Sequence, residues 1–496
     1  MDKHTKEQRR KNMQAVKSSG TKPEQKLKEK LIEHGILFEE HRNDIVGKPD
    51  FYLPEYDIVI FVDGEYWHGK DWELKKHEIK SNQLFWFSKI EKNMQRDDEV
   101  NRVLQLKGYT VLRFWESDLK NIQNCIERVT EEMSKRKKND SDETKVSEPL
   151  HVYDTILFDE VTKVPFPPPS DPKFKFIDLF AGIGGFRLAF QNLGGQCVFS
   201  SEWDDYAQVT YKENFGEIPN GDITKIEAAK VPEHDILTGG FPCQAFSIAG
   251  KRGGFEDTRG TLFFDAARII AEKQPKAFFL ENVKGLRNHD RGRTLSTILN
   301  TLREDLGYFV PEPQIINAKD YGVPQNRERI FIVGFRGDLG ITEFEYPKPL
   351  GINVKFADIK EEKPVTARYY LSDVYLESLK RHKQRHEDKG NGFGFEIIPD
   401  DGIANAIVVG GMGRERNLVY DDRLEDFTPE THIKGEVNRE YIRKMTPREW
   451  ARLQGFPDDF IIPVADVHAY KQFGNSVAVP AIQATAEKII EKLNLW

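Results

Sequence analysis

The chain has 496 residues, of which 38% are hydrophobic and 31% charged, and its formal net charge is −8. This length exceeds what one ordinary core supports, so we expect at least two domains. The charged N-terminus lacks the apolar stretch of a secretory signal, and no apolar run approaches the roughly 20 residues that cross a bilayer. With only three widely separated cysteines, a disulfide framework is not expected, and the composition predicts a soluble cytoplasmic protein without membrane contact.

Net charge argues weakly against nucleic-acid binding, but the distribution of charge argues the other way. Residues 1–30 carry ten Lys or Arg against four Asp or Glu. Further basic clusters lie at 135–138 and 380–385 and around Arg414 and Arg416. Each cluster alone is more typical of a solvated face than of a binding site.

The N-terminal part alternates helices and strands. Spacing and β-propensity predict helices over 26–37, 98–106 and 122–133 and strands over 56–62 and 109–114. Residues 134–143 are highly charged, and 165–172 are rich in proline, which favours an extended spacer. We therefore predict an N-terminal domain over 1–133, a linker over 134–172 and a larger domain over 173–496.

The C-terminal part predicts a doubly wound α/β fold with a mostly parallel sheet. Strands are expected over 174–180, 197–200, 235–238, 277–280 and 329–334, with helices such as 262–272 between them and 482–493 at the end. Residues of about 340–440 are irregular and rich in glycine, which suggests an inserted recognition region.

Polar or glycine-rich segments follow three successive strands of this part. Asp178 to Phe186 contains the loop Gly182-Ile183-Gly184-Gly185, Glu202-Trp203 ends the next strand, and Gly221-Asp222-Ile223 follows one helix later. In such folds ligands bind at the carboxyl edge of the sheet, so these segments predict a nucleoside site.

Cys243 lies in a Gly/Pro-shaped turn, Gly239-Gly240-Phe241-Pro242-Cys243-Gln244, after another predicted strand. On its own spacing the thiol is equally compatible with a small buried hydrophobe and with a nucleophile.

Seven segments in order resolve that alternative. They are DLFAGIGGF, SEW, GDI, GGFPCQAFS, ENV at 281–283, QNRER at 325–329 and QFGNSV at 472–477. Over about 174–496 the chain resembles the DNA cytosine-5 methyltransferases of bacterial modification systems. The resemblance implies a Rossmann-like domain that binds S-adenosylmethionine, with a smaller target-recognition region at about 340–440, and duplex DNA as the partner.

The resemblance also assigns roles to residues. Cys243 is implied as the nucleophile that adds to the cytosine ring, Glu281 as the proton donor at N3, and Arg327 and Arg329 as groups that hold the base and phosphate, with Arg329 orienting Glu281. The implied cofactor-binding residues are Phe180, Gly182, Gly184, Glu202, Trp203, Asp222, Ile223, Pro242, Asn475 and Ser476. Because the target base must leave the duplex, residues 244–255 are expected to form a mobile loop over DNA, and the segment 409–417 to supply base contacts.

The N-terminal part contains a second group of candidate residues. Gly47-Lys48-Pro49-Asp50-Phe51 precedes the strand that ends at Val62, and Asp63-Gly64-Glu65-Tyr66-Trp67-His68 follows it. Carboxylates placed in this way are typical of a Mg²⁺ site for phosphodiester hydrolysis, although the lysine of the general nuclease pattern is missing.

Over about 2–133 the chain resembles the very short patch repair endonucleases, which nick beside T:G mismatches and have a restriction-endonuclease-like α/β/α fold. The resemblance rests on the segments KNM at 11–13, GKPDF, VIF, YWH, FW at 85–86, KI, KN, RD at 96–97 and WE at 115–116, together with Glu24. It implies that Asp50 and the Val62 carbonyl hold Mg²⁺, that His68 activates water with Glu24 nearby, and that Tyr66, Trp67 and Trp86 form a DNA wedge.

Two departures from that family affect this expectation. Asp63 stands where the family commonly has histidine, and the cysteines of the family's structural zinc site are missing. We therefore expect no zinc, and we expect Asp63 to supply a further metal-binding carboxylate.

Together the two parts predict a bifunctional bacterial protein, monomeric and associated with the nucleoid, that methylates cytosine and nicks the mismatch left by deamination of its product. Mismatch-repair proteins are possible partners. Three alternatives stay open: a nuclease domain of the restriction type, an inactive DNA clamp, and a methyltransferase that acts on RNA.

Overall fold

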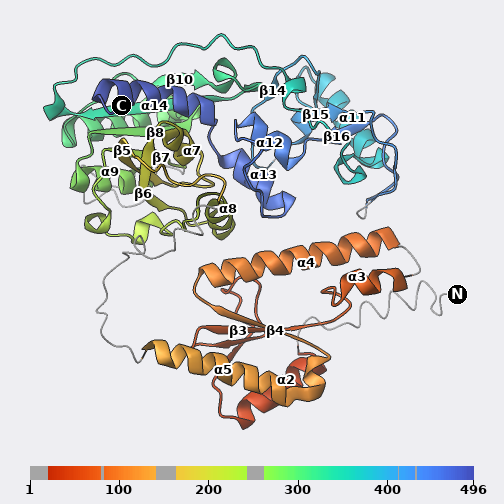
Figure 1. Ribbon diagram of the computed structural model, residues 1–496. Coiled ribbons are helices and arrows are strands. Elements are labelled where there is room, and N and C mark those ends of the chain that lie inside the picture. The colour runs from red at the N-terminus through yellow and green to blue at the C-terminus, as the bar shows by residue number, and fades with distance from the viewer. Residues whose placement is uncertain (1–19, 80–82, 141–163, 243–261, 411–412, 430–432) are drawn as a thin grey trace. The chain divides into compact units, whose positions relative to one another are not determined.

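The computed structural model describes residues 20–79, 83–140, 164–242, 262–410, 413–429 and 433–496. Contacts divide the chain into two compact units, Met1–Leu150 and His151–Trp496. Figure 1 shows both units, and each is described below by itself. Within the described residues, no helix combines the length and apolar character that a membrane span requires.

The N-terminal unit is a sheet covered by helices on both faces. Its strands are β1 (Glu39–Glu40), β2 (Phe51–Leu53), β3 (Ile58–Asp63) and β4 (Thr110–Trp115), in the order β1-β2-β3-β4. Its α-helices are α2 (Lys22–Glu33), the short α3 (Trp72–Lys75), α4 (Gln83–Leu106) and α5 (Ile122–Asp140). β3 is antiparallel to β2 and parallel to β4.

Successive side chains of β3 pack into cores on opposite faces of the sheet, which explains why helices cover both faces. Ile58 and Ile60 belong to a core that includes residues of α2 and α5, whereas Val59 and Phe61 belong to a second core with Val100 and other residues of α4. Because successive side chains of a strand point to opposite faces, one short apolar run supports helices on both sides.

Two N-terminal helices extend beyond their predicted bounds. α4 begins at Gln83 rather than Asp98, and α5 continues to Asp140 although 134–140 was predicted as linker. Lys135 pairs with Glu131 and Glu132 at 2.9 and 2.7 Å, one turn away. Ion pairs at this spacing support the last turns of α5, where residues 134–140 continue the helix without apolar side chains, which is why composition alone placed the boundary too early.

The C-terminal unit contains a seven-stranded sheet. Its strands are β5 (Phe174–Leu179), β6 (Gly195–Ser201), β7 (Ile236–Gly240), β8 (Ala277–Val283), β9 (Tyr308–Phe309), β10 (Gln314–Asn317) and β12 (Glu328–Arg336). The order is β10-β12-β8-β7-β5-β6, with β9 also paired to β12. The helices of this part are α7 (Gly185–Asn192), α8 (Asp205–Phe215), α9 (Leu262–Lys273), α10 (Arg293–Asn300) and α14 (Val479–Leu493).

The prediction of a mostly parallel sheet is correct only for half of it. β6, β5, β7 and β8 are parallel neighbours, but β12 is antiparallel to β8, β9 and β10. The apolar pattern of a strand buried on both faces is the same in either direction, so residue type could not give the direction of β12.

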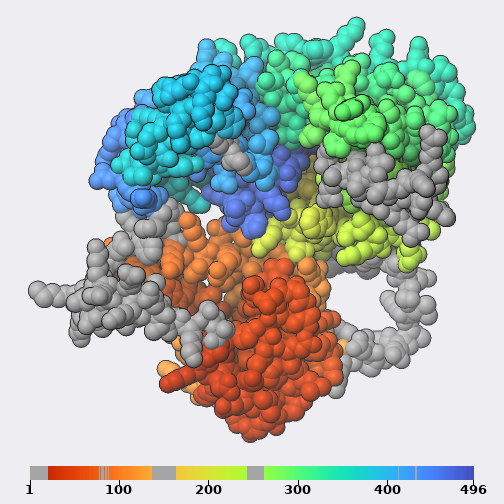
Figure 2. All heavy atoms as spheres, turned by 180° about the vertical axis from the view of Figure 1, so that it is seen from behind, coloured from red at the N-terminus to blue at the C-terminus, as the bar shows by residue number. Residues whose placement is uncertain are grey.

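A smaller lobe of the same unit contains short elements. They are β11 (Gln325–Asn326), α11 (Asp373–Glu387), β13 (Ile397–Ile398), β14 (Ala404–Asn405), β15 (Leu418–Tyr420), β16 (Ile442–Lys444), α12 (Pro447–Leu453) and α13 (Asp466–Asn475). Figure 2 shows the cyan and blue residues of this lobe beside the green residues of the large sheet. The expectation of an irregular region missed α11, whose Ser372 caps the Tyr375 amide at 3.2 Å and whose Leu376 and Leu379 are buried.

Candidate active sites

The loop after β5 has a backbone that few residue types adopt. Phe180, Gly182 and Gly184 all have positive φ, at 56°, 55° and 86°. A Cβ on Gly184 would lie 2.3 Å from the Phe215 ring, so this position excludes any side chain. The loop ends at the N-terminus of α7, where backbone N–H groups have no partner within the helix.

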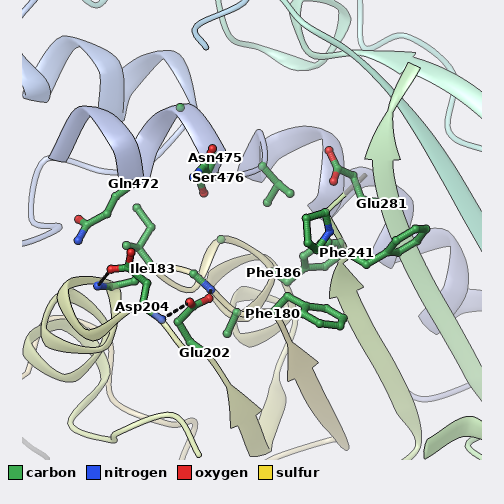
Figure 3. A pocket seen from close by; sticks show the side chains of 18 of the residues that line it. Phe180, Ile183, Phe186, Glu202, Asp204, Phe241, Glu281, Gln472, Asn475 and Ser476 are labelled. Carbon is green, nitrogen blue, oxygen red and sulfur yellow. Dashed lines mark hydrogen bonds between the residues drawn. The ribbon is translucent and has the colours of Figure 1, made fainter. Parts of the chain in front are cut away.

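A cavity of about 400 Å³ opens beside this loop (Figure 3). Ten of the sequence-predicted residues line it: Phe180, Gly182, Glu202, Trp203, Pro242, Glu281, Arg327, Arg329, Asn475 and Ser476. Six of them lie at or just after the ends of β5, β6, β7 and β8. Arg329 lies on β12 and Arg327 just before it, and Asn475 and Ser476 lie at the C-terminal end of α13. The size lies in the range of small-molecule sites in proteins.

Three predicted residues do not line this cavity. Gly184 acts through backbone shape, as above. The Asp222 carboxylate accepts hydrogen bonds from the Thr224 backbone N–H and hydroxyl at 3.1 and 2.8 Å, and Ile223 is 3% exposed within the large core. Sequence reasoning missed Ile183, Phe186, Asp204, Phe241, Lys471 and Gln472, which also line the cavity.

Glu202 ties the glycine loop to the end of β6. Its carboxylate accepts from the Gly182 N–H at 2.8 Å and from the Asp204 N–H at 2.7 Å. Burial raises the pKa of this carboxyl group, and the two backbone donors oppose that rise. Each oxygen retains a lone pair, so the carboxylate can still accept from a ligand hydroxyl. The neighbouring Trp203 side chain is 74% exposed and available for stacking.

Glu281 lies at the far side of the same cavity, on β8. Arg329 Nε contacts Glu281 Oε1 at 3.0 Å. Burial raises the pKa of Glu281, and the positive charges of Arg329 and Arg327 only partly offset it. The geometry favours a carboxyl group that gains a proton more readily than a carboxyl in water does.

Arg327 has a different environment from the one expected for a phosphate-binding residue. Its guanidinium donates to the carbonyl oxygens of Ile407, Gly474 and Ser476 at 2.9, 3.2 and 2.6 Å. The residue is 2% exposed, and burial together with Arg329 lowers its pKa to about 9. These bonds tie Arg327 to the backbone on both sides of Asn475, whereas its buried Nε has no hydrogen-bond partner, and its contact with base or phosphate stays a prediction.

The nucleophile candidate Cys243 and the loop 244–255 lie outside the described residues. The residues just before them are held in place, because Asn282 Nδ2 donates to the Phe241 carbonyl oxygen at 2.8 Å. In the segment 409–417, Arg414 lies 4.8 Å from the Tyr470 ring centroid, and Arg416 contacts Glu396 at 3.3 Å, so both guanidinium groups have protein partners.

In the N-terminal unit, Asp50 is the centre of an acidic group. Its carboxylate accepts from the Val62 N–H at 2.7 Å, which places it beside the end of β3. The pKa of Asp50 is raised to about 6, chiefly by burial, with the carboxylates of Glu24 and Asp63 adding to the rise and the Val62 N–H and His41 opposing it. Such repulsion is relieved when a cation binds, so these residues fit a divalent metal.

His68 lies in a neighbouring cluster rather than beside Glu24. Its Nδ1 hydrogen bonds to Asp97 and lies 3.6 Å from Asp63 Oδ1. Arg113 Nη1 donates to both oxygens of Asp63 at 3.0 and 2.8 Å. Asp63 is therefore paired with Arg113 and is not among Glu24, His41 and Asp50, the three described side chains grouped closely enough to hold one ion, so its role as a metal ligand stays a prediction. Asp97 and Arg113 were not identified as site residues.

The three predicted wedge residues form one aromatic cluster. Ring centroids of Tyr66, Trp67 and Trp86 lie 5.3 to 5.7 Å apart, and Lys89 Nζ lies 4.8 Å from the Trp67 centroid. Tyr66 is 47% exposed, so the cluster reaches the surface. An exposed aromatic cluster beside a lysine suits contact with unstacked bases.

Comparison with known proteins supports both halves. Residues 174–491 match the family model of C-5 cytosine-specific DNA methylases, and residues 1–74 match that of the DNA mismatch endonuclease Vsr. The type II methyltransferase M.HpaII of Haemophilus parainfluenzae is 74% identical over 338 residues, which are 67% of this chain and 94% of that protein. M1.ScrFI of Lactococcus lactis subsp. cremoris is 49% identical over 69% of this chain and 84% of its own length.

Solved structures agree on the fold of the larger unit. The Dnmt2 methyltransferase of S. pombe aligns with a TM-score of 0.50 at 19% identity and covers 65% of this chain and 99% of its own. The Entamoeba histolytica methyltransferase EhMeth aligns with the same TM-score at 18% identity, over 64% of this chain and 98% of its own. The chain therefore belongs to the C-5 cytosine-specific DNA methylases and carries a Vsr endonuclease domain at its N-terminus.

Proposed function

We propose that the C-terminal domain methylates one specific duplex DNA sequence with S-adenosylmethionine held in the cavity beside the glycine loop. The observation that carries this proposal is the convergence of Phe180, Glu202, Trp203 and Asn475 on the cavity that also contains Glu281. The left-handed loop, the exposed ring and the carboxylate with free lone pairs fit the backbone, adenine and ribose of such a cofactor.

In the proposed reaction the Cys243 thiolate adds to C6 of an extruded cytosine, while Glu281 donates a proton to N3. The cofactor, when bound, supplies an electrophilic methyl group for the C5 carbon. Return of the N3 proton to the Glu281 carboxylate, loss of the C5 proton to a base and departure of the thiolate then restore the aromatic ring and the starting enzyme. Arg329 orients Glu281, and burial raises the pKa of that carboxyl group against the charge of Arg329, which suits a proton donor.

The target sequence is proposed to be the one that M.HpaII methylates. The 74% identity extends over 94% of that relative, a span too long to leave out its recognition region. Bisulfite sequencing of DNA from cells that express this chain tests the proposal, because the methylated sites of the two proteins would coincide. Methylated tRNA without methylated DNA would contradict it.

For the N-terminal domain we propose hydrolysis of one DNA strand at a T:G mismatch that arises when the methylated cytosine deaminates. The α/β/α layers are compatible with a restriction-endonuclease-like fold. Asp50 and the Val62 carbonyl are proposed to hold Mg²⁺. His68, oriented by its hydrogen bond to Asp97, is proposed to activate the attacking water. The aromatic cluster is proposed to enter the base stack. Cleavage of paired, unmodified DNA would instead favour a restriction nuclease, and no cleavage would favour an inactive clamp.

The domain limits are also a proposal. The methylase match begins at 174 and α5 ends at Asp140, so we place the linker between these positions. We propose that the chain acts on DNA as a monomer and that mismatch-repair proteins act on the nick.

A further inference from the structure

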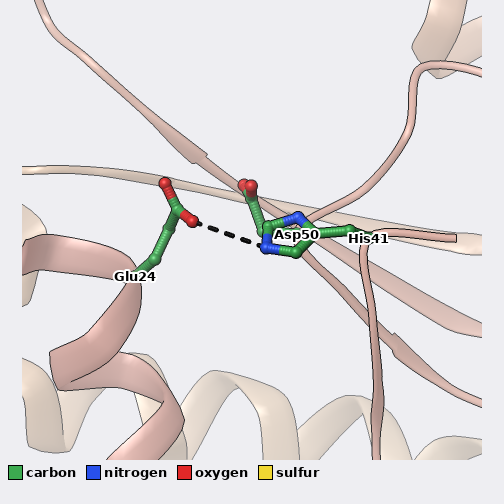
Figure 4. A group of neighbouring side chains, drawn as sticks. All are labelled: Glu24, His41 and Asp50. Carbon is green, nitrogen blue, oxygen red and sulfur yellow. Dashed lines mark ion pairs between the residues drawn. The ribbon is translucent and has the colours of Figure 1, made fainter. Parts of the chain in front are cut away.

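A third donor lies beside the two acidic residues of the nuclease site. Glu24 in the first turn of α2, His41 just after β1 and Asp50 just before β2 approach one another (Figure 4). One ligand atom from each lies within 4.8 Å of the other two, and His41 Nε2 lies 3.9 Å from Glu24 Oε2. Among the described residues, these are the three side chains grouped closely enough to hold one ion.

The two carboxylates are fixed by other contacts and still have free lone pairs. Glu24 is 6% exposed and accepts from the Gly20 N–H at 2.8 Å and the Thr21 hydroxyl at 2.7 Å, one on each oxygen. Asp50 accepts one bond from the Val62 N–H. Since a carboxylate oxygen has two lone pairs, each group can bind a cation without losing these bonds.

His41 is held toward the carboxylates by an unusual backbone. Its φ is 50°, a left-handed conformation that disfavours most residues by about 1–2 kcal/mol. The His41 N–H donates to the Asp50 carbonyl oxygen at 3.3 Å, so the backbone at the histidine is attached to the residue that precedes β2. The backbone thus brings the ring toward the acidic pair, although the His41 side chain is 44% exposed.

An imidazole changes which cations this site prefers. Mg²⁺ favours oxygen ligands in an octahedral arrangement, whereas imidazole nitrogen suits transition metals such as Co²⁺, Ni²⁺ and Zn²⁺, with Mn²⁺ intermediate. We propose that Glu24, His41 and Asp50 form a mixed nitrogen and oxygen site that binds transition-metal dications more tightly than Mg²⁺. This inference rests on the proposed cation site at Asp50 but concerns binding, which is measured without DNA.

The test uses the full chain and binding of Co²⁺, Mn²⁺ and Mg²⁺ by calorimetry, with the visible absorption of Co²⁺ as a second readout. A second histidine pair, His382 and His386 on α11, has ring centroids 4.6 Å apart and could also bind Co²⁺. All variants are therefore made in a His382→Gln/His386→Gln background, with His34→Gln as the matched control outside the site.

We expect His41→Gln to weaken Co²⁺ and Mn²⁺ binding by about tenfold or more, to change Mg²⁺ binding by less than about threefold, and to alter the Co²⁺ spectrum. Asp50→Asn should weaken all three ions, and His34→Gln none. Equal Co²⁺ binding by the parent and His41→Gln, or no Co²⁺ binding by the parent, would overturn the inference. If His41 governs binding but T:G DNA stays uncut, the metal site stands and the proposed nuclease activity fails.

Discussion

Arg329 Nε and Glu281 Oε1 lie 3.0 Å apart in the cavity that carries the methylase motifs. The two residues are diagonal neighbours across antiparallel strands, because Arg329 of β12 lies opposite Val283 and Glu281 is two residues before Val283 on β8. The pair fixes the carboxyl group while burial raises its pKa. The strand pairing therefore sets the position of Glu281, whereas its raised pKa comes from burial against the opposing charge of Arg329.

Glu281→Gln should lower the methylation rate by about 10²- to 10⁴-fold, because the amide keeps the shape but cannot donate the proton. Binding of S-adenosylmethionine should change little. Single-turnover methylation and calorimetry measure the two effects separately. In the parent, the rate should fall as pH rises through the raised pKa of Glu281, since the protonated form disappears. A variant with an unaltered rate would remove Glu281 from the chemistry.

Asp178→Asn should make stability less dependent on pH. Burial raises the pKa of Asp178 to about 7, and its Oδ2 has no hydrogen-bond partner. The folded state therefore holds a proton that the unfolded chain releases near pH 4, so stability falls as pH rises from about 4 to about 7. The loss is on the order of a few kcal/mol in the parent and absent in the variant. Urea unfolding at pH 5 and pH 8 gives the free energy of unfolding at each pH for the parent and for Asp178→Asn. An equal change between the two pH values in both proteins would contradict the prediction.

Gly184→Ala should destabilise the C-terminal domain more than Gly182→Ala. Both positions have positive φ, but a Cβ at Gly184 would meet the Phe215 ring at 2.3 Å, whereas nothing lies within 4 Å of a Cβ at Gly182. Backbone strain alone accounts for about 1–2 kcal/mol at each position, and forcing a methyl group into a packed ring adds about 1–3 kcal/mol. Thermal unfolding of Gly184→Ala and Gly182→Ala compares the two losses of stability. Equal losses would contradict the prediction and would show that the Phe215 ring moves aside.

Much of this organisation follows from the sequence. The strands at 174, 197, 236 and 277 are apolar runs bounded by polar or glycine residues, and their ends carry the motifs that converge on the cavity. These local signals determine both the strand and the edge at which a ligand binds.

Other features depend on contacts distant in sequence, which local patterns do not report. The hydrogen bond from Arg113 to Asp63 joins residues 50 positions apart and gives the Asp63 carboxylate a cationic partner. His41 enters the site because β1 pairs with β2, and β1 is only two residues long. The direction of β12 and the backbone role of Arg327 depend in the same way on the assembled sheet.

Cys243→Ser should abolish methylation and leave mismatch nicking intact, and Asp50→Ala should do the reverse. The two substitutions remove the proposed thiolate nucleophile and the proposed metal ligand, which belong to different compact units of the chain. Both activities are measured on the same preparations, with circular dichroism to confirm folding. Loss of both activities in either folded variant would show that the two domains are not separable.

The most direct test of the account is a duplex in which the methylated cytosine of the chain's own target is replaced by thymine opposite guanine. The full chain should nick the thymine strand in a divalent-cation buffer, should leave the paired, unmodified duplex intact, and should lose nicking with Asp50→Ala. Cleavage of the paired duplex, or an intact mismatch with every cation tried, would contradict the claim that this methylase carries the repair nuclease for its own product.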